Sequence, residues 1–283
     1  MIDAALTVAD ALEAAATRFR TAGIPEPRRE AERLWGALRG EGRSAAILAR
    51  SRPLSAADGR GFADAVHRRA LGEPLAYVTG SCGFRRLELS IDRRALIPRP
   101  ETELLVELLL QRVCSGTVAD VGTGSGCIAL SLLDEGRFDR VYAIDRSAAA
   151  LDLARENAVR LGQAPHFLRG DLAGALRPDA CDALVSNPPY LTDAEYAALE
   201  PGVRDWEPAM ALVSGPDGMR ATRALLADAL RVVRPGGWIA LELDSGRAPL
   251  AGQAAAAAGW AGVSIINDLF GRERYLLAQR SDA

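Results

Sequence analysis

The stretch Asp120-Val121-Gly122-Thr123-Gly124-Ser125-Gly126 decides the fold that we predict for this chain. It closes an apolar run at residues 118–121, which we interpret as a strand, and it leads into a helical pattern at residues 127–133. Glycines between a strand and a helix allow a tight turn, and they let a ligand approach the backbone beside the positive end of the helix. The stretch therefore predicts a cofactor loop, although nicotinamide- and flavin-binding chains carry similar ones.

Strand-like and helical segments alternate from residue 101 to the end of the chain. Short apolar runs predict the strands, and apolar residues at helical spacing predict the helices between them. The expected strands are residues 118–121, 141–144, 166–168, 183–186, 238–243, 263–266 and 275–278, and the expected helices are residues 101–113, 127–133, 148–161 and 219–233. Such alternation implies helices on both faces of a mainly parallel sheet. We predict an α/β fold with a Rossmann-like, seven-stranded, mainly parallel sheet.

The first 75 residues differ from the rest because their apolar spacing is helical. Residues 8–19 and 31–38 each place apolar side chains on one helical face, and Ser55 predicts the cap of a third helix. Residues 80–91 change to the alternating pattern of a hairpin, and residues 96–100 are too rich in proline for a helix or a central strand. We therefore divide the chain into a helical bundle at residues 1–75, a β-hairpin linker at residues 76–100 and an α/β domain at residues 101–283.

Composition and charge narrow the class of protein. The chain has 283 residues, of which 49% are hydrophobic and 25% charged, as in an ordinary globular protein with one large and one small domain. No apolar run approaches the ~20 residues of a membrane span, and no secretory signal is visible, so we expect a cytoplasmic protein. Four separated cysteines and two histidines predict no metal site. A net charge of −3 without a basic tail disfavours free nucleic acid as the main partner.

Three aspartates lie at or just after the carboxyl ends of the first three expected strands. Asp120 precedes a G-x-G-x-G loop, where it can accept a hydrogen bond from a ligand ammonium or simply cap the loop as a buried carboxylate. Asp145 ends the next strand, where a carboxylate commonly meets ribose hydroxyls. Asp171 is placed to accept from an adenine N–H, with Leu172 against the ring; the alternative is a helix N-cap before residues 173–176.

The second motif is Asn187-Pro188-Pro189-Tyr190, directly after the strand expected at residues 183–186. The following proline pushes Asn187 toward extended geometry, and two successive prolines remove two backbone N–H groups. What remains is a corner of hydrogen-bond acceptors beside an aromatic ring. Such a corner suits a planar NH2 group, as in a primary amide, adenine or cytosine. A rigid turn that merely closes the strand is the alternative.

Together these motifs resemble a class I S-adenosylmethionine-dependent methyltransferase that acts on a planar nitrogen. More narrowly, the chain resembles the bacterial peptide chain release factor glutamine methyltransferase family, which methylates the glutamine of a Gly-Gly-Gln motif. Further segments carry the resemblance, in order: residues 73–80 with Phe84, residues 96–103 (Leu-Ile-Pro-Arg-Pro-Glu-Thr-Glu), residues 206–208 with Gly215 and Gly218, and residues 267–272. The resemblance covers nearly the whole chain.

The resemblance implies roles for the candidate residues. It implies S-adenosylmethionine as methyl donor, without a metal, at Asp120, Gly122, Thr123, Gly124, Ser125, Gly126, Asp145, Asp171, Leu172 and Asn187. The Asn187 side-chain oxygen and the Pro188 carbonyl would accept the two amide hydrogens of the substrate, beside Pro189, with Tyr190 packed on the amide plane or anchored in the core. Residues 1–75 would dock a release factor, and we expect a monomer that binds neither membrane nor nucleic acid.

Some points stay open at the level of sequence. The segment 243–247 departs from the family pattern, and its contribution is undefined. Glu101 and Glu103 either line the pocket or serve as first-turn charges favoured by the helix dipole. Alternative functions are methylation of a ribosomal protein glutamine or of a nucleic acid exocyclic amine, a non-catalytic cofactor-binding module and, least supported by the glycine spacing, a nicotinamide oxidoreductase.

Overall fold

A computed structural model describes residues 6–282 of the chain, and the chain divides into two compact units. One unit comprises Met1–Gly80 together with Pro201–Trp206, and the other comprises Ser81–Glu200 and Glu207–Ala283. No helix within residues 6–282 is long and apolar enough to cross a membrane.

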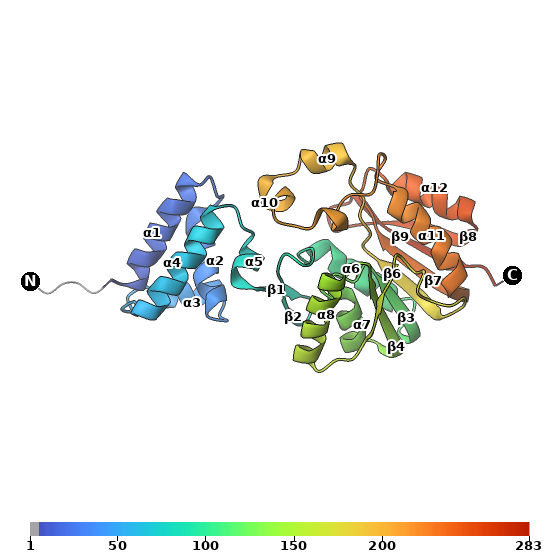
Figure 1. Cartoon of the computed structure of the whole chain (residues 1–283), viewed down its shortest axis with the longest axis horizontal. Helices are drawn as coiled ribbons and strands as arrows, with labels where there is room; N and C mark the ends of the chain where they lie inside the picture. Colours follow the sequence, from blue (N-terminus) through green and yellow to red (C-terminus); the bar gives the residue numbers. More distant parts are fainter. Residues whose placement is uncertain (1–5, 283) are drawn as a thin grey trace, which may run out of the picture. The chain divides into compact units, whose positions relative to one another are not determined.

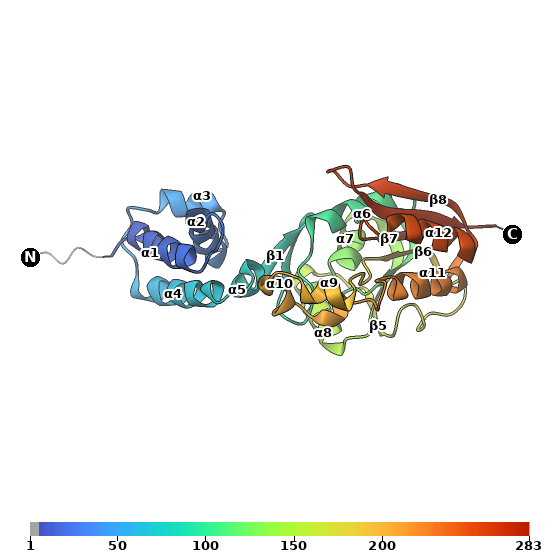
Figure 2. The same ribbon diagram turned by 90° about the horizontal axis from the view of Figure 1, so that it is seen from above.

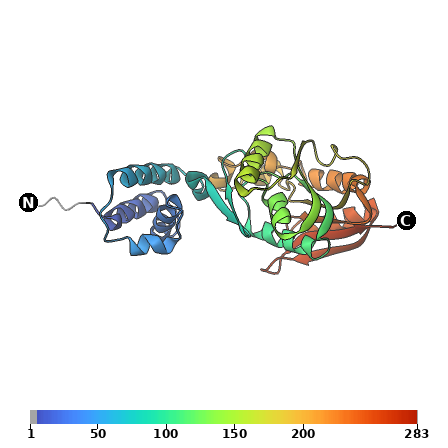
Figure 3. The same cartoon turned by 90° about the horizontal axis from the view of Figure 1, so that it is seen from below.

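The helical unit is a bundle of helices (Figures 1 and 3), and its core consists of aromatic and aliphatic side chains. Phe19 and Leu34 are fully buried, and the rings of Trp35 and Phe62 meet edge to face with centroids 5.1 Å apart. Ser55 caps α4 by accepting a hydrogen bond from a first-turn amide, as predicted. The helices are α1 (Val8–Thr21), α2 (Pro27–Leu38), α3 (Arg43–Leu48), α4 (Ala56–Ala70), α5 (Leu75–Thr79) and α10 (Pro201–Arg204).

The larger unit is built on a seven-stranded sheet, as predicted, with the strand order β5-β4-β3-β6-β7-β9-β8. The first five strands run parallel, and β9 lies antiparallel between β7 and β8. The strands are β3 (Ser115–Val121), β4 (Arg137–Asp145), β5 (His166–Arg169), β6 (Cys181–Ser186), β7 (Val233–Glu242), β8 (Trp260–Asn267) and β9 (Glu273–Arg280). The carboxyl ends of the parallel strands therefore meet along one edge of the sheet.

Helices cover both faces of this sheet (Figure 2). Successive side chains of a strand point to opposite faces, so each face presents apolar residues that a layer of helices buries. Leu105, on α6 (Pro100–Leu110), and Leu130, on α7 (Cys127–Glu135), pack in the core cluster of one face. The other face buries Leu225 of α11 (Arg220–Val232) and Ala251 of α12 (Ala248–Ala258). The remaining long helix is α8 (Ala148–Leu161).

A β-hairpin precedes the sheet, as predicted. Its strands are β1 (Ser81–Phe84) and β2 (Leu87–Ser90), within the residues 80–91 where the sequence predicts a hairpin, and Gly80 caps the end of α5. The chain reverses at Arg85, which has a positive φ of 52°. Phe84 and Leu89 are nearly fully buried in the same core cluster as α6 and α7. The hairpin is thus part of the core of the larger unit.

Two short helices of the larger unit that hydrophobic periodicity did not indicate follow the second motif. They are α9 (Asp193–Ala197) and the 3₁₀ helix η1 (Ala209–Ala211). Both are too short to bury a periodic apolar face, which explains why the spacing carries no sign of them.

Candidate active site

A cavity of about 600 Å³ opens at the carboxyl ends of the parallel strands. Its size falls within the range of roughly 300–1,000 Å³ that is usual for small-ligand sites. Its walls include residues 94–99, the loops after β3, β4 and β6, and the first turns of α11. Sites at this edge of a parallel sheet are the rule for open α/β folds.

The glycine loop after β3 forms one wall of the cavity. Gly122, Gly124 and Gly126 have φ values of 75°, 55° and 85°, a region that favours glycine. The Gly122 amide donates to the carbonyl of Ile144 at 2.8 Å, which ties the loop to the end of β4. A methyl group added at Gly126 would lie 3.3 Å from Ala154 Cβ on α8, so the loop also approaches that helix closely. Thr123 and Ser125 line the same wall.

Asp145, which the sequence analysis expects to meet ribose hydroxyls, lies on the cavity wall. Its Oδ2 accepts a hydrogen bond from the Gly124 amide at 3.0 Å, and its Oδ1 accepts from the Ser147 amide at 2.8 Å. Each carboxylate oxygen can accept more than one hydrogen bond. The carboxylate is therefore held in a fixed orientation and retains capacity for a ligand hydroxyl.

Asp120 lies behind the loop and is not among the cavity-lining residues. Its carboxyl group is fully buried, and its Oδ2 accepts hydrogen bonds from Thr123 Oγ1 at 2.6 Å and from the Ala129 amide at 3.1 Å. The structure shows the loop-capping contacts at Oδ2, whereas Oδ1 is buried without a hydrogen-bond partner among the described residues. Burial raises the pKa of Asp120 to about 7.

A raised pKa at Asp120 predicts that the protein becomes less stable as the pH rises. In the unfolded chain the carboxyl loses its proton near pH 4, whereas the folded protein keeps it to about pH 7, so the unfolding free energy falls across that window. The substitution Asp120→Asn keeps a side-chain acceptor and introduces a group that cannot ionise. We expect the stability of this variant, relative to the unmodified protein, to increase from pH 5 to pH 7.5 in urea unfolding.

The matched control is Asp152→Asn, a change of the same chemistry at an exposed position on α8. Its stability should follow that of the unmodified protein at both pH values. Parallel pH profiles for Asp120→Asn and the unmodified protein would contradict the buried, protonated state of Asp120.

Asp171 and Leu172 both line the cavity. The alternative of a helix N-cap at Asp171 is wrong, because the described residues 173–176 form a turn and no helix. The chain turns at Leu172, which has a φ of 48°, and the Asp171 carbonyl accepts from the Gly174 amide at 3.2 Å. The exposed Asp171 carboxylate is thereby presented at the cavity by a turn.

The Asn187–Tyr190 motif forms the wall next to the glycine loop. Asn187, Pro188 and Pro189 line the cavity, and Ser186 ties their strand to β3 by donating from Oγ to the Val121 carbonyl at 2.6 Å. Tyr190 is not among the lining residues, and its amide donates to the Leu212 carbonyl at 3.1 Å. Burial raises the pKa of the Tyr190 hydroxyl to about 12, so this group stays protonated.

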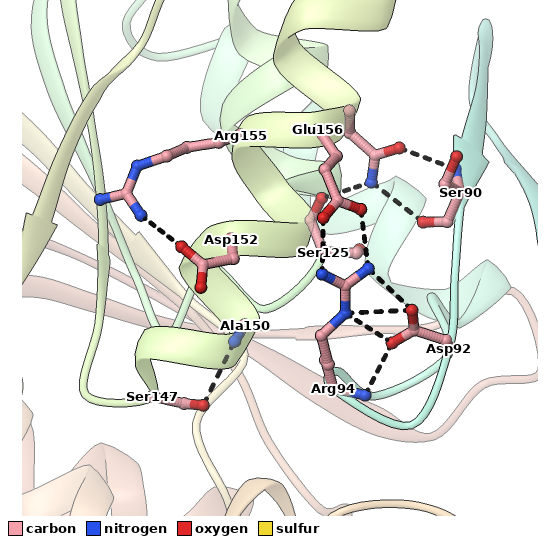
Figure 4. Close-up of polar contacts among 10 residues, drawn as sticks. Ser90, Asp92, Arg94, Ser125, Ser147, Ala150, Asp152, Arg155 and Glu156 are labelled. Carbon is pink, nitrogen blue, oxygen red and sulfur yellow. Dashed lines mark hydrogen bonds and ion pairs between the residues drawn. The ribbon is translucent and has the colours of Figure 1, made fainter.

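Residues 92–95 are held against α8 by charged side chains (Figure 4). Arg94, which lines the cavity, donates to both carboxylate oxygens of Glu156 at 2.7 Å, and it also pairs with Asp92. Next to this cluster the buried Asn157 side chain donates to the carbonyls of Ser90 and Ser125, both at 3.0 Å. The hairpin, the glycine loop and α8 are thus joined around one wall of the cavity.

Glu207 binds the proline-rich segment at residues 96–100. Its buried carboxylate accepts from Arg99 Nη2 at 2.6 Å and from the Ile97 amide at 3.1 Å. Glu101 and Glu103 are not among the lining residues; Glu103 Oε1 instead accepts from the Arg85 amide at 3.0 Å. Glu207 therefore ties down the segment 94–99, whose residues line the cavity.

The segment 243–247, whose contribution the sequence left undefined, provides Arg247, which donates hydrogen bonds to neighbouring segments. Arg247 donates to Glu195 Oε2 at 2.6 Å, to the Asp217 carbonyl at 2.9 Å and to Asp244 Oδ1 at 2.9 Å. A methyl group at Gly218 would collide with the Tyr190 carbonyl and with Arg247. Arg247 therefore joins the chain after the Asn187–Tyr190 motif to the loop before α11.

Sequence reasoning assigned no role to two buried residues beneath the motif, Thr102 and Glu242. Thr102 Oγ1 donates to Glu242 Oε2 at 2.7 Å, and Asn187 Nδ2 donates to Thr102 Oγ1 at 3.2 Å. A glutamate at the end of an otherwise apolar strand was the available signal, because an unpaired buried carboxylate is costly. Its partner lies 140 positions away in the sequence, which the spacing of residues does not reveal.

The chain is similar to known proteins along nearly its whole length. Two family models match the chain: PrmC N-terminal domain over residues 10–80 and Methyltransferase small domain over residues 100–200. A release factor glutamine methyltransferase of Moorella thermoacetica is 42% identical over 283 residues, which cover 98% of this chain and 100% of that protein. Another, from Deinococcus radiodurans, is 40% identical and covers 96% of this chain and 98% of its own length. The chain belongs to the release factor glutamine methyltransferase family.

Solved structures of methyltransferases have a similar fold. A methyltransferase from Pyrococcus furiosus aligns with a TM-score of 0.52 at 19% identity and covers 69% of this chain and 89% of its own. A 16S rRNA methyltransferase of T. thermophilus, in complex with AdoMet and guanosine, aligns with a TM-score of 0.50 at 21% identity, covering 71% of this chain and 49% of its own. The predicted family, fold class and assignment as a methyltransferase are confirmed.

Proposed function

We propose that this protein transfers a methyl group from S-adenosylmethionine to the side-chain amide nitrogen of the glutamine in the Gly-Gly-Gln motif of peptide chain release factors. The observation that carries this proposal is the position of Asn187. Its side chain lines the cavity that the glycine loop also lines, and its NH2 group is already bonded to Thr102. An acceptor oxygen is thus left for a substrate amide next to a cofactor wall.

The cavity residues fit S-adenosylmethionine as the donor. Asp145, fixed by two backbone amides, would accept from the ribose hydroxyls, and Asp171 with Leu172 would meet the adenine. Gly122 and Gly124 leave room for the cofactor beside the loop because they carry no side chain. When bound, the cofactor supplies an electrophilic sulfonium methyl group.

The residues around Asn187 would then align the substrate. An amide nitrogen is a poor nucleophile, and orientation of the reacting groups can lower the barrier by roughly 7–11 kcal/mol. The Asn187 Oδ1 and the Pro188 carbonyl would accept the two N–H groups of the glutamine. These hydrogen bonds strengthen as positive charge develops on the nitrogen, so they stabilise the transition state more than the ground state.

The same acceptors would exclude glutamate. A carboxylate presents only lone pairs to an acceptor-only corner, so the corner's oxygens would face it without a donor. We assign no general base to the reaction: Tyr190 stays protonated, and Glu242 meets the corner only through Thr102. The proton of the methylated nitrogen would pass to water or to a carbonyl oxygen. We expect the reaction to take place in the cytoplasm.

The test is a methylation assay with labelled S-adenosylmethionine and full-length release factors, followed by peptide fragmentation. We expect one added methyl group on the Gly-Gly-Gln glutamine and none on a release factor in which that glutamine is replaced by glutamate. Label on a ribosomal protein or on RNA, with unlabelled release factors, would overturn the proposal in favour of one of the alternative substrates.

A further inference from the structure

Three polar side chains from three different elements form a chain of hydrogen bonds beneath the acceptor corner. Asn187 follows β6, Thr102 lies in the first turn of α6, and Glu242 ends β7. Asn187 Nδ2 donates to Thr102 Oγ1 at 3.2 Å, and Thr102 Oγ1 donates to Glu242 Oε2 at 2.7 Å. Thr102, which also lines the cavity, is 3% exposed, and Glu242 is 1% exposed, so both hydrogen bonds lie largely out of contact with bulk water.

The direction of this chain determines which end of the Asn187 amide faces Thr102. A threonine hydroxyl has one proton to donate. Because that proton is committed to the Glu242 carboxylate, Thr102 can only accept from Asn187. If the amide turned over, its oxygen would face the Thr102 oxygen with no proton between them. The arrangement therefore favours the orientation in which the NH2 group of Asn187 points to Thr102 and its Oδ1 is free.

We propose that Thr102 and Glu242 are positioning residues that fix the Asn187 amide with its acceptor oxygen toward the substrate. This assignment rests on the proposed function, in which Asn187 Oδ1 accepts from the substrate glutamine. It makes selection of an amide over a carboxylate depend on a glutamate that never touches the substrate. Asn187 alone does not define the corner, because an asparagine amide presents a donor as readily as an acceptor.

The charge state of Glu242 decides whether the hydrogen bonds from Asn187 through Thr102 to Glu242 all run in one direction. A protonated Glu242 can itself donate to Thr102, which frees the Thr102 proton for the Asn187 oxygen and permits the reversed amide. Burial raises the pKa of Glu242 to about 7, and the Thr102 hydrogen bond opposes that shift. Ionisable groups that interact with Glu242 come from α6 and the residue before it, β9 and the segment after β6: Glu101, Arg99, Arg274, Tyr275 and Tyr190.

The simpler alternative is that Thr102 merely satisfies a buried carboxylate and contributes only to stability. The two interpretations differ in what a variant changes. A stabilising pair affects the melting temperature and all binding steps together, whereas a positioning pair affects the turnover number with little effect on the cofactor dissociation constant.

The experiment compares Thr102→Val with Thr102→Ser in the full-length protein. Valine matches the shape of threonine without its hydroxyl, and serine keeps the hydroxyl. We expect Thr102→Val to lower kcat on a release factor by about 10-fold, the size of one hydrogen bond, while the dissociation constant for S-adenosylmethionine changes less than about twofold. Thr102→Ser should restore most of the lost turnover, and thermal unfolding reports whether each variant is folded.

A second arm uses the pH dependence of kcat. The unmodified protein should lose turnover as the pH falls below about 7, and Glu242→Gln should have reduced turnover at pH 8 with that acid limb weakened. The assignment fails if Thr102→Val turns over normally, or if Thr102→Ser is as impaired as Thr102→Val. Failure of the proposed function is a separate outcome: the unmodified protein would leave the glutamine unmethylated, or Asn187→Ala would retain full activity.

Discussion

Asn187→Ala is expected to lower the turnover number on a release factor by about 100-fold or more. The change removes the side-chain acceptor that would bond the substrate N–H, and deleting one hydrogen bond that strengthens in the transition state typically costs about 10²–10³ in kcat. The alanine leaves β6 and its bond from Ser186 to the Val121 carbonyl intact, so the strand end should keep its position.

The measurement separates catalysis from cofactor binding. Single-turnover methylation gives the rate of the chemical step, and calorimetric titration gives the dissociation constant for S-adenosylmethionine. The glycine loop and Asp145 remain in place, so we expect that constant to change only a few-fold. A variant that turns over at the normal rate would remove Asn187 from the mechanism, and a variant with normal chemistry but weakened cofactor binding would make Asn187 a cofactor contact instead.

The sheet and the general position of the site could be predicted because their signals are local. An apolar run, a glycine loop and a helical pattern are adjacent in the sequence, and each parallel strand brings its carboxyl end to the same edge. Asp145 ends one such strand, and Asp171 and Asn187 follow two others, so their meeting at one cavity follows from the sheet alone. The cofactor loop needed no information from distant parts of the chain.

Pairs of residues that are far apart in sequence could not be predicted in this way. Thr102 meets Glu242 across 140 positions, and Arg99 meets Glu207 across 108. Nothing in the spacing selects these partners, because the contact depends on how α6 and the segment before it pack against the finished sheet. The same holds for two of the acceptors of Arg247, because Glu195 on α9 and the Asp217 carbonyl lie 52 and 30 positions away in the sequence.

The contacts of Asp120 could not be assigned from the sequence motif alone. The sequence places an acid before the glycine loop, next to where a ligand is expected, and leaves open whether it faces the ligand or the protein. The structure directs its carboxyl to Thr123 and to the Ala129 amide, inside the loop. Proximity along the chain to a binding loop therefore did not mean exposure to the cavity.

Gly122→Ala is expected to weaken S-adenosylmethionine binding on the order of 10- to 100-fold. Gly122 has a φ of 75°, lines the cavity, and has no protein atom within 4 Å of where a methyl group would stand. The added methyl group would therefore occupy cavity space, and an extra methyl in a packed site costs about 1–3 kcal/mol. Backbone strain at a positive φ adds about 1–2 kcal/mol of instability to the folded protein.

Gly162→Ala is the control that introduces the same backbone strain without filling space in the cavity. Gly162 ends α8 with a φ of 66°, also has no atom within 4 Å of an added methyl group, and does not line the cavity. Both variants should lose similar stability in urea unfolding, because both place alanine in the left-handed region. Only Gly122→Ala should raise the dissociation constant for S-adenosylmethionine in calorimetric titration. Equal affinities for the two variants would mean that the cofactor does not lie against Gly122, and a different wall of the cavity would have to hold it.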